Sequence, residues 1–139
     1  MKRLLILVAV LSLAACAQMN SMMGRGNTVG VNLTGAEEVP PVNTSGSGTG
    51  SFTIASDGAV SGSVTTKGVS GMMAHIHQGA KGTNGPVIIP LTKSGETYSA
   101  PAGAKLTDVQ LQAFKAGNLY VNVHSPTNKG GEVRAQLQP

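Results

Sequence analysis

The residues best suited to chemistry in this 139-residue chain are its three histidines, which fall in two short segments. His75 and His77 lie within residues 74–77, and His124 closes residues 121–124. Residues i and i+2 of a β-strand project from the same face, so His75 and His77 would leave one strand side by side. If the two segments are neighbouring strands of one sheet, all three imidazoles meet at one place.

Three neutral imidazoles on rigid strands suit copper or zinc, since both metals accept nitrogen donors. We therefore expect a copper or zinc site at His75, His77 and His124. Methionine thioethers favour Cu(I), and Met72 and Met73 lie just before the His-x-His segment as candidate soft ligands. Packing is the alternative interpretation of these two side chains. Met19, Met22 and Met23 are further methionines of this kind, and their alternative interpretation is as residues of a flexible segment that bind nothing.

Residues 119–124 and 132–137 are predicted to form a hairpin across the turn-rich segment 125–131. The simplest register places His124 opposite Glu132 and Asn122 opposite Arg134. Alternation then makes one face of the hairpin aliphatic and the other polar. The polar face carries Tyr120, Asn122, His124, Glu132 and Arg134.

A hydrogen-bonded polar network is the alternative interpretation of the same residues, because buried polar groups need partners. In that network His75 or His77 would bond to loop carbonyls near residues 79–86, and Glu132 would pair with Arg134 or His124. Arg134 opposes a bound cation unless Glu132 neutralises it. The sequence leaves open the metal site, the network and a role in pH response or ligand binding.

Period-2 alternation of apolar residues, broken by turn residues, predicts an all-β fold. One segment has helical spacing instead: Thr107 and Gln110 form a capping box and Gly117 supplies a stop, which predicts one short helix over 107–116. We expect an antiparallel Greek-key β-sandwich with an aliphatic core, and a loop over residues 42–50. The strands are expected at 29–33, 51–55, 60–65, 73–77, 86–91, 96–99, 119–124 and 132–137.

The N-terminal residues have the form of a secretory signal, with a basic start and an apolar run too short to span a bilayer. Residues 13–16, Leu-Ala-Ala-Cys, resemble the lipobox of bacterial lipoproteins, whose cysteine becomes the acylated N-terminus. The resemblance implies a signal peptide over 1–15 and a lipid on Cys16 that binds the membrane. Residues 17–28 are polar and contain glycine with no apolar period, so we expect a flexible tether over 16–28. The resemblance also implies the outer membrane, because Ala17 is not the aspartate linked with inner-membrane retention. An ordinary signal peptide with an incidental cysteine is the alternative.

Composition argues against a nucleic-acid-binding protein and against a fold held together by disulfide bonds. The formal net charge is only +4, and the lysines and arginines neither cluster nor interleave with aromatic residues, so we expect no nucleic-acid partner. Cys16 is the only cysteine, so no disulfide can form within one copy of the chain. The segment 79–85 contains glycines, but its spacing is not that of a phosphate-binding loop.

Five ordered segments resemble the motifs of the CHRD domain, named from chordin. They are residues 33–41, 74–79, 84–87, 118–124 and 130–137, and the likeness covers essentially the whole predicted domain at 29–139. The resemblance implies an all-β module outside the cytoplasm and, by analogy with chordin, an envelope protein or polysaccharide as partner. It implies much less about activity.

A partial likeness to the copper/zinc superoxide dismutase sandwich rests on the His-x-His segment and a distant strand histidine. Those enzymes use more histidines than this chain contains, and a disulfide that it cannot make. Fold-level analogy is in any case no evidence of a reaction. We therefore expect a non-enzymatic binding module, with a dismutase-like enzyme as the less favoured alternative.

Overall fold

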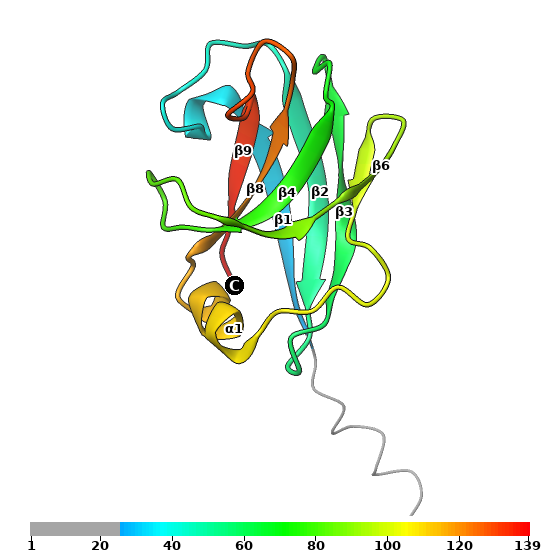
Figure 1. The fold of residues 1–139 in the computed structure, drawn as a ribbon, viewed down its shortest axis with the longest axis vertical. Helices are drawn as coiled ribbons and strands as arrows, with labels where there is room; N and C mark the ends of the chain where they lie inside the picture. The colour runs from blue at the N-terminus through cyan, green and yellow to red at the C-terminus, as the bar shows by residue number, and fades with distance from the viewer. Residues whose placement is uncertain (1–25) are drawn as a thin grey trace, which may run out of the picture.

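The computed structural model describes residues 26–139, and strands account for most of its regular structure (Figure 1). Two short helical elements accompany them: a 3-10 turn, η2, over Gly35–Glu37, and one α-helix, α1, over Asp108–Lys115. The strands are β1 (Asn27–Thr34), β2 (Ser47–Ile54), β3 (Val60–Lys67), β4 (Met73–Gln78), β5 (Val87–Pro90), β6 (Thr92–Ser94), β7 (Thr97–Ser99), β8 (Leu119–His124) and β9 (Val133–Leu137).

These strands form one antiparallel sheet in the order β5-β4-β8-β9-β1-β2-β3-β7-β6. Its two outermost strands, β5 and β6, follow one another in the chain and are joined by Leu91. Strand β6 also contacts β4, so the sheet curls until its edges nearly meet (Figure 1). The predicted all-β antiparallel class with one short helix is confirmed.

Alternation along each strand sends aliphatic side chains into the space that the curled sheet encloses. Helix α1 covers one end of this core with Leu111 and Phe114, and its predicted capping box between Thr107 and Gln110 is present. Apart from three larger aromatic side chains, Phe52, Tyr98 and Phe114, the core is aliphatic, as the composition predicts. Its strand residues include Val31, Leu33, Val64, Ile76, Leu119, Val121, Val123, Val133 and Leu137.

The structure corrects the predicted boundaries at three places. Strand β2 begins at Ser47, so the second half of the predicted 42–50 loop is strand. The error arose because glycines hide the alternation here: a Cβ on Gly50 would overlap the Ser63 carbonyl of β3. Strand β6 was missed, since it is three exposed residues with no apolar pattern. Strand β1 begins at Asn27, within the predicted tether.

The predicted signal peptide at 1–15, the lipid-bearing Cys16 and most of the tether lie outside the described residues. So do Met19, Met22 and Met23. Across residues 26–139, the structure contains no helix with the length and apolar character needed to span a membrane.

The outward face of β4, β8 and β9 is mostly polar, and much of it is buried because three loops lie over it (residues 35–46, 79–86 and 125–131). Side chains on this face bond to the backbone of those loops. Gln136 donates to the Gly79 carbonyl at 2.8 Å, and Asn122 donates to the Gly130 carbonyl at 3.3 Å. We call this region the outer polar layer; it contains the histidines.

The cap of α1 gives a test of the fold. Thr107→Ala removes the hydroxyl that accepts from the Gln110 amide, so the free energy of unfolding should fall by about 1 kcal/mol. Urea denaturation measures the loss. Thr107→Ser keeps an accepting hydroxyl and should stay near the wild-type value; equal losses in both variants would contradict the role of the cap.

Candidate metal centre

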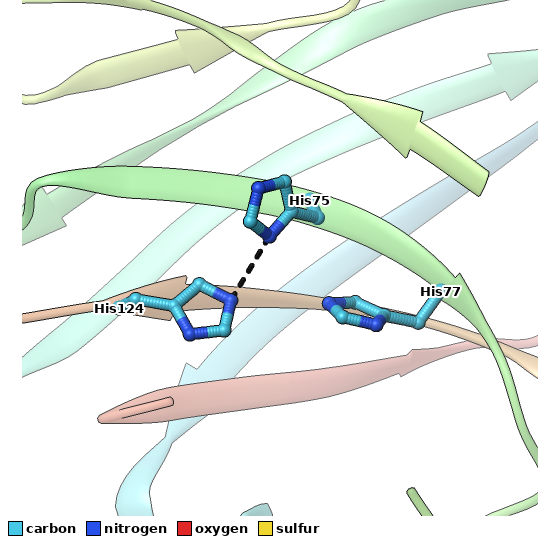
Figure 2. Close-up of side chains that lie close together, drawn as sticks. All are labelled: His75, His77 and His124. Carbon is cyan, nitrogen blue, oxygen red and sulfur yellow. Dashed lines mark hydrogen bonds between the residues drawn. The ribbon is translucent and has the colours of Figure 1, made fainter. Parts of the chain in front are cut away.

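Strands β4 and β8 are direct neighbours, as convergence of the histidines requires. Their register pairs Met73 with His124, His75 with Asn122 and His77 with Tyr120. All three imidazoles therefore lie in the outer polar layer, and one nitrogen from each lies within 4.8 Å of the others (Figure 2). The predicted three-histidine cluster is present.

Backbone carbonyls fix the orientation of two of the rings. Nδ1 of His77 donates to the Gly85 carbonyl at 3.0 Å, and Nδ1 of His124 donates to the Lys129 carbonyl at 2.9 Å. A carbonyl can only accept, so in a neutral ring each Nε2 keeps its lone pair. Histidines that bind metals are oriented in this way by a partner on their other nitrogen.

The two lone pairs have different surroundings. Nε2 of His124 accepts a hydrogen bond from Nδ1 of His75 at 3.0 Å (Figure 2). Nε2 of His77 is buried and has no hydrogen-bond partner among the described residues. The cluster thus holds one buried acceptor that nothing in the described chain satisfies.

The spacing of the three nitrogens is close to that of a shared ion. Metal–nitrogen bonds of about 2.0–2.1 Å in a tetrahedral site put the ligand nitrogens about 3.4 Å apart. The His75–His124 pair is slightly closer, at 3.0 Å, and the cluster as a whole extends to 4.8 Å. Small rotations of the side chains would bring all three onto one ion, which suits the donor set.

The environment keeps the imidazoles of His75 and His77 uncharged and therefore able to act as ligands. Burial, together with the neighbouring His124 and His77, lowers the pKa of His75 to about 4. Burial also lowers the pKa of His77, against the opposing effect of its bond to Gly85. Neither ring carries an extra proton near neutral pH, but for Nδ1 of His75 to bind an ion its proton must move to Nε2, and the ion then replaces the bond to His124.

Tyr120 links the cluster to the buried Arg134. The Tyr120 ring is parallel to the His77 ring within 3°, with centroids 4.6 Å apart, and the Arg134 guanidinium carbon lies 3.5 Å from its centroid. Because β8 lies between β4 and β9, the imidazole and the guanidinium approach the Tyr120 ring from its two sides. The positive charge of Arg134 is thus separated from His77 by an aromatic ring.

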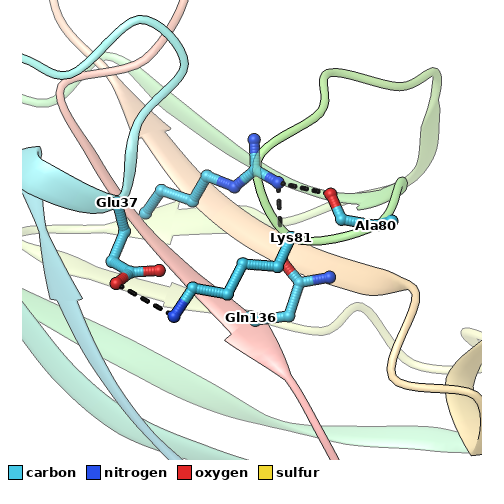
Figure 3. Close-up of polar contacts among 5 residues, drawn as sticks. Glu37, Ala80, Lys81 and Gln136 are labelled. Atoms are coloured by element: carbon cyan, nitrogen blue, oxygen red, sulfur yellow. Dashed lines mark hydrogen bonds and ion pairs between the residues drawn. The ribbon is translucent and has the colours of Figure 1, made fainter.

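Three oxygens accept hydrogen bonds from Arg134, and none belongs to a carboxylate. They are Asn84 Oδ1 at 3.3 Å, the Ala80 carbonyl at 3.3 Å and Gln136 Oε1 at 3.4 Å; Figure 3 shows the bonds to Ala80 and Gln136. Within residues 26–139 no carboxylate lies within ion-pair distance of Arg134; the nearby Glu37 pairs with Lys81 at 3.4 Å. The predicted pairing of Arg134 with Glu132 is therefore wrong.

Glu132 bonds to residues of the covering loops instead of to Arg134. The predicted register is present, with Asn122 opposite Arg134, but the Glu132 carboxylate accepts from Thr44 at 2.8 Å. Hydrogen bonds from Ser125, Thr44 and Asn128 lower the pKa of Glu132. Glu132 therefore secures two of the covering loops, and it forms no ion pair with His124 either.

The acidic residue that sequence reasoning missed is Glu38. It is 4 % exposed, and burial raises its pKa to about 7, partly offset by Arg134, Asn122 and the Val39 amide. Adjacent glutamates at 37 and 38 gave no sign of which would be buried. The available signal was the motif at residues 33–41, in which Glu38 precedes a cis Val39–Pro40 bond.

Asn122 lies between Glu38 and His77, near enough to affect the pKa of both without a well-formed hydrogen bond to either. Its Oδ1 and Glu38 Oε1 are buried and unpartnered within the described part of the chain. Gly131 has a positive φ of 129°, and a Cβ there would collide with Glu38 and Asn122. Only glycine allows the 125–131 loop to approach this closely.

The two predicted soft ligands, Met72 and Met73, lie at the rim of the cluster. They are 48 % and 46 % exposed, so neither packs in the core. Met73 is the cross-strand neighbour of His124.

Comparison with known proteins agrees with the resemblance drawn from the motifs. The family model of the CHRD domain matches residues 29–137. The chain therefore belongs to the CHRD domain family. Neither the search of curated proteins nor the search of solved structures returned a match.

The lowered pKa of His75 gives a pH test on the metal-free protein. Between its folded value of about 4 and the ordinary 6.5, the unfolded chain binds a proton that the folded chain does not. Acidification across this window should therefore reduce the free energy of unfolding. In urea denaturation with a chelator present, His75→Asn should show a shallower loss than the wild type.

Glu38 should act with the opposite sign. Between the ordinary value of 4.5 and its folded value of about 7, the folded chain holds the proton, so its contribution to stability falls as pH rises. Glu38→Gln is thus the control: it should steepen the rise of stability with pH, whereas His75→Asn flattens it. Equal slopes in all three proteins would contradict the assigned pKa shifts.

Proposed function

We propose that this CHRD domain is a copper- or zinc-binding module that works outside the cytoplasm, with His75, His77 and His124 as ligands. The observation that supports it best is the unpartnered, buried Nε2 of His77. It lies beside two further imidazoles whose ring orientation is also fixed. A buried acceptor without a partner costs about 1–3 kcal/mol, and a bound cation would remove that cost.

Arg134 is the main electrostatic objection, and its surroundings weaken it. The guanidinium lies against the Tyr120 ring and donates to three neutral oxygens, which disperses its charge. Glu38 lies near Arg134 and titrates near neutral pH, so its ionised form would offset part of the positive charge. The proposal is for metal binding, with no catalytic step assigned.

Metal titration of a soluble chain, residues 17–139, tests the proposal; the described core lies wholly within 29–137, so this chain retains it. Wild type should bind one Cu or Zn ion per chain by calorimetry. His75→Asn, His77→Asn and His124→Asn should each weaken binding by at least about tenfold, because each removes a direct ligand.

Lys67→Ala, an exposed change at the end of β3, is the matched control and should bind like the wild type. Wild-type chain that takes up no metal, or histidine variants that bind as tightly as wild type, would exclude the site.

We further propose that the module is held at the envelope, in the outer membrane, by a lipid on Cys16, as its resemblance to a lipobox supports. Expressed in bacteria with a labelled fatty acid, the wild type should incorporate label and sediment with outer membranes. Cys16→Ser should lose the label and appear in the soluble fraction. Membrane association that persists in Cys16→Ser would contradict lipid anchoring.

The second candidate is an interaction module for an envelope protein or polysaccharide, in which the histidines only hold loops. The bonds from His77 and His124 to loop carbonyls favour it. Metal titration and urea denaturation together separate the two functions. This candidate predicts that the wild type takes up no metal and that the His77→Asn and His124→Asn variants lose stability.

A further inference from the structure

The entry to β4 contains an irregularity beside the cluster. The Met72 amide donates to the His124 carbonyl at 2.8 Å, while Met73 is the residue paired with His124 in the β4–β8 register. Two consecutive residues thus oppose one residue on the neighbouring strand, which is the arrangement of a β-bulge.

The flanking residues show where the bulge sends the side chains. A Cβ on Gly71 would meet Tyr98 and Val123, which belong to the core, so position 71 faces inward. Ala74 is 1 % exposed and also faces the core. Regular alternation would place one outward residue between two inward ones, but here there are two. Met72 and Met73 therefore share the outward stretch beside His124.

Both thioethers are available to a ligand, because the side chains are about half exposed. Met73 is the cross-strand neighbour of His124 and lies two residues before His75 on the same strand. Directly opposed side chains have Cβ atoms about 4.5–5.5 Å apart, within the reach of a flexible methionine. A soft sulfur donor is thus next to the nitrogen donors.

The charge around the cluster favours a monovalent ion. Arg134 lies on the far side of Tyr120, and the part of its positive charge that ionised Glu38 does not offset opposes a divalent ion more strongly than a monovalent one. The rim is also apolar, since the exposed Val87 is paired with His77 across β4 and β5. Poor hydration penalises the higher charge more.

We propose that the three-histidine centre is selective for Cu(I), with the Met73 thioether as fourth ligand and the Met72 thioether beside it. This inference rests on the proposed function and names its metal. Thioether sulfur binds Cu(I) well and contributes little to Zn(II), so the bulge would give the site its selectivity.

The test compares two double variants of residues 17–139 under anaerobic conditions. Met72→Leu/Met73→Leu removes both thioethers and keeps apolar side chains of similar volume at exposed positions. Met22→Leu/Met23→Leu makes the same change in the N-terminal segment and is the matched control. Cu(I) affinity is measured by competition with a colorimetric Cu(I) chelator, and Zn(II) affinity by competition with a zinc dye.

The expected result is a Cu(I) affinity at least about tenfold weaker in Met72→Leu/Met73→Leu, with Zn(II) affinity unchanged and the control equal to wild type. X-ray absorption at the copper edge should show a sulfur neighbour that this variant lacks. Equal loss for both metals, or no loss for Cu(I), would overturn Cu(I) selectivity while leaving the histidine site in place. A wild type that binds neither metal would overturn both proposals.

Discussion

The rest of the structure depends on one constraint: polar side chains that alternation sends outward from β4, β8 and β9 are buried or partly buried, so they need partners. Loop backbone supplies most of them. The Gln136 side chain donates hydrogen bonds to the carbonyls of Gly79 and Gly117. The backbone of Gly85 bonds to the side chains of Tyr120 and His77. The Lys129 carbonyl accepts from His124. The loops thus lie where the sheet's side chains can bond them, and the imidazoles are oriented by the bonds that fix the covering chain.

The domain therefore has two buried regions that are stabilised by different interactions, the apolar core and the outer polar layer. Inside the curled sheet, aliphatic side chains are held by burial and close packing, and no geometry beyond fit is required. In the outer polar layer, hydrogen-bond direction matters, and three buried atoms have no partner among residues 26–139: His77 Nε2, Asn122 Oδ1 and Glu38 Oε1. These atoms come from three separate segments of the chain, and the Asn122 side-chain amide lies between the other two residues, Glu38 and His77.

Much of this could be predicted from sequence, because it follows from local rules. Strand parity placed His75, His77 and His124 on one face, and the Thr107–Gln110 pattern located the helix. The Asn122–Arg134 register followed from the length of the 125–131 turn segment. The predictions that were wrong or missing concern residues whose surroundings come from distant parts of the chain. Glu132 bonds to Thr44, 88 residues away, and Glu38 is buried by loops that no periodicity describes. Gly50 permits a close strand contact that hid the start of β2.

The direction in which the chain enters the barrel sets how the module would face its surroundings. Strand β1 begins at the end of the barrel near α1, whereas the loops over 35–46 and 125–131 lie at the opposite end (Figure 1). If the lipid proposed on Cys16 anchors the chain, these loops lie at the end of the domain opposite the one where the anchored segment joins β1.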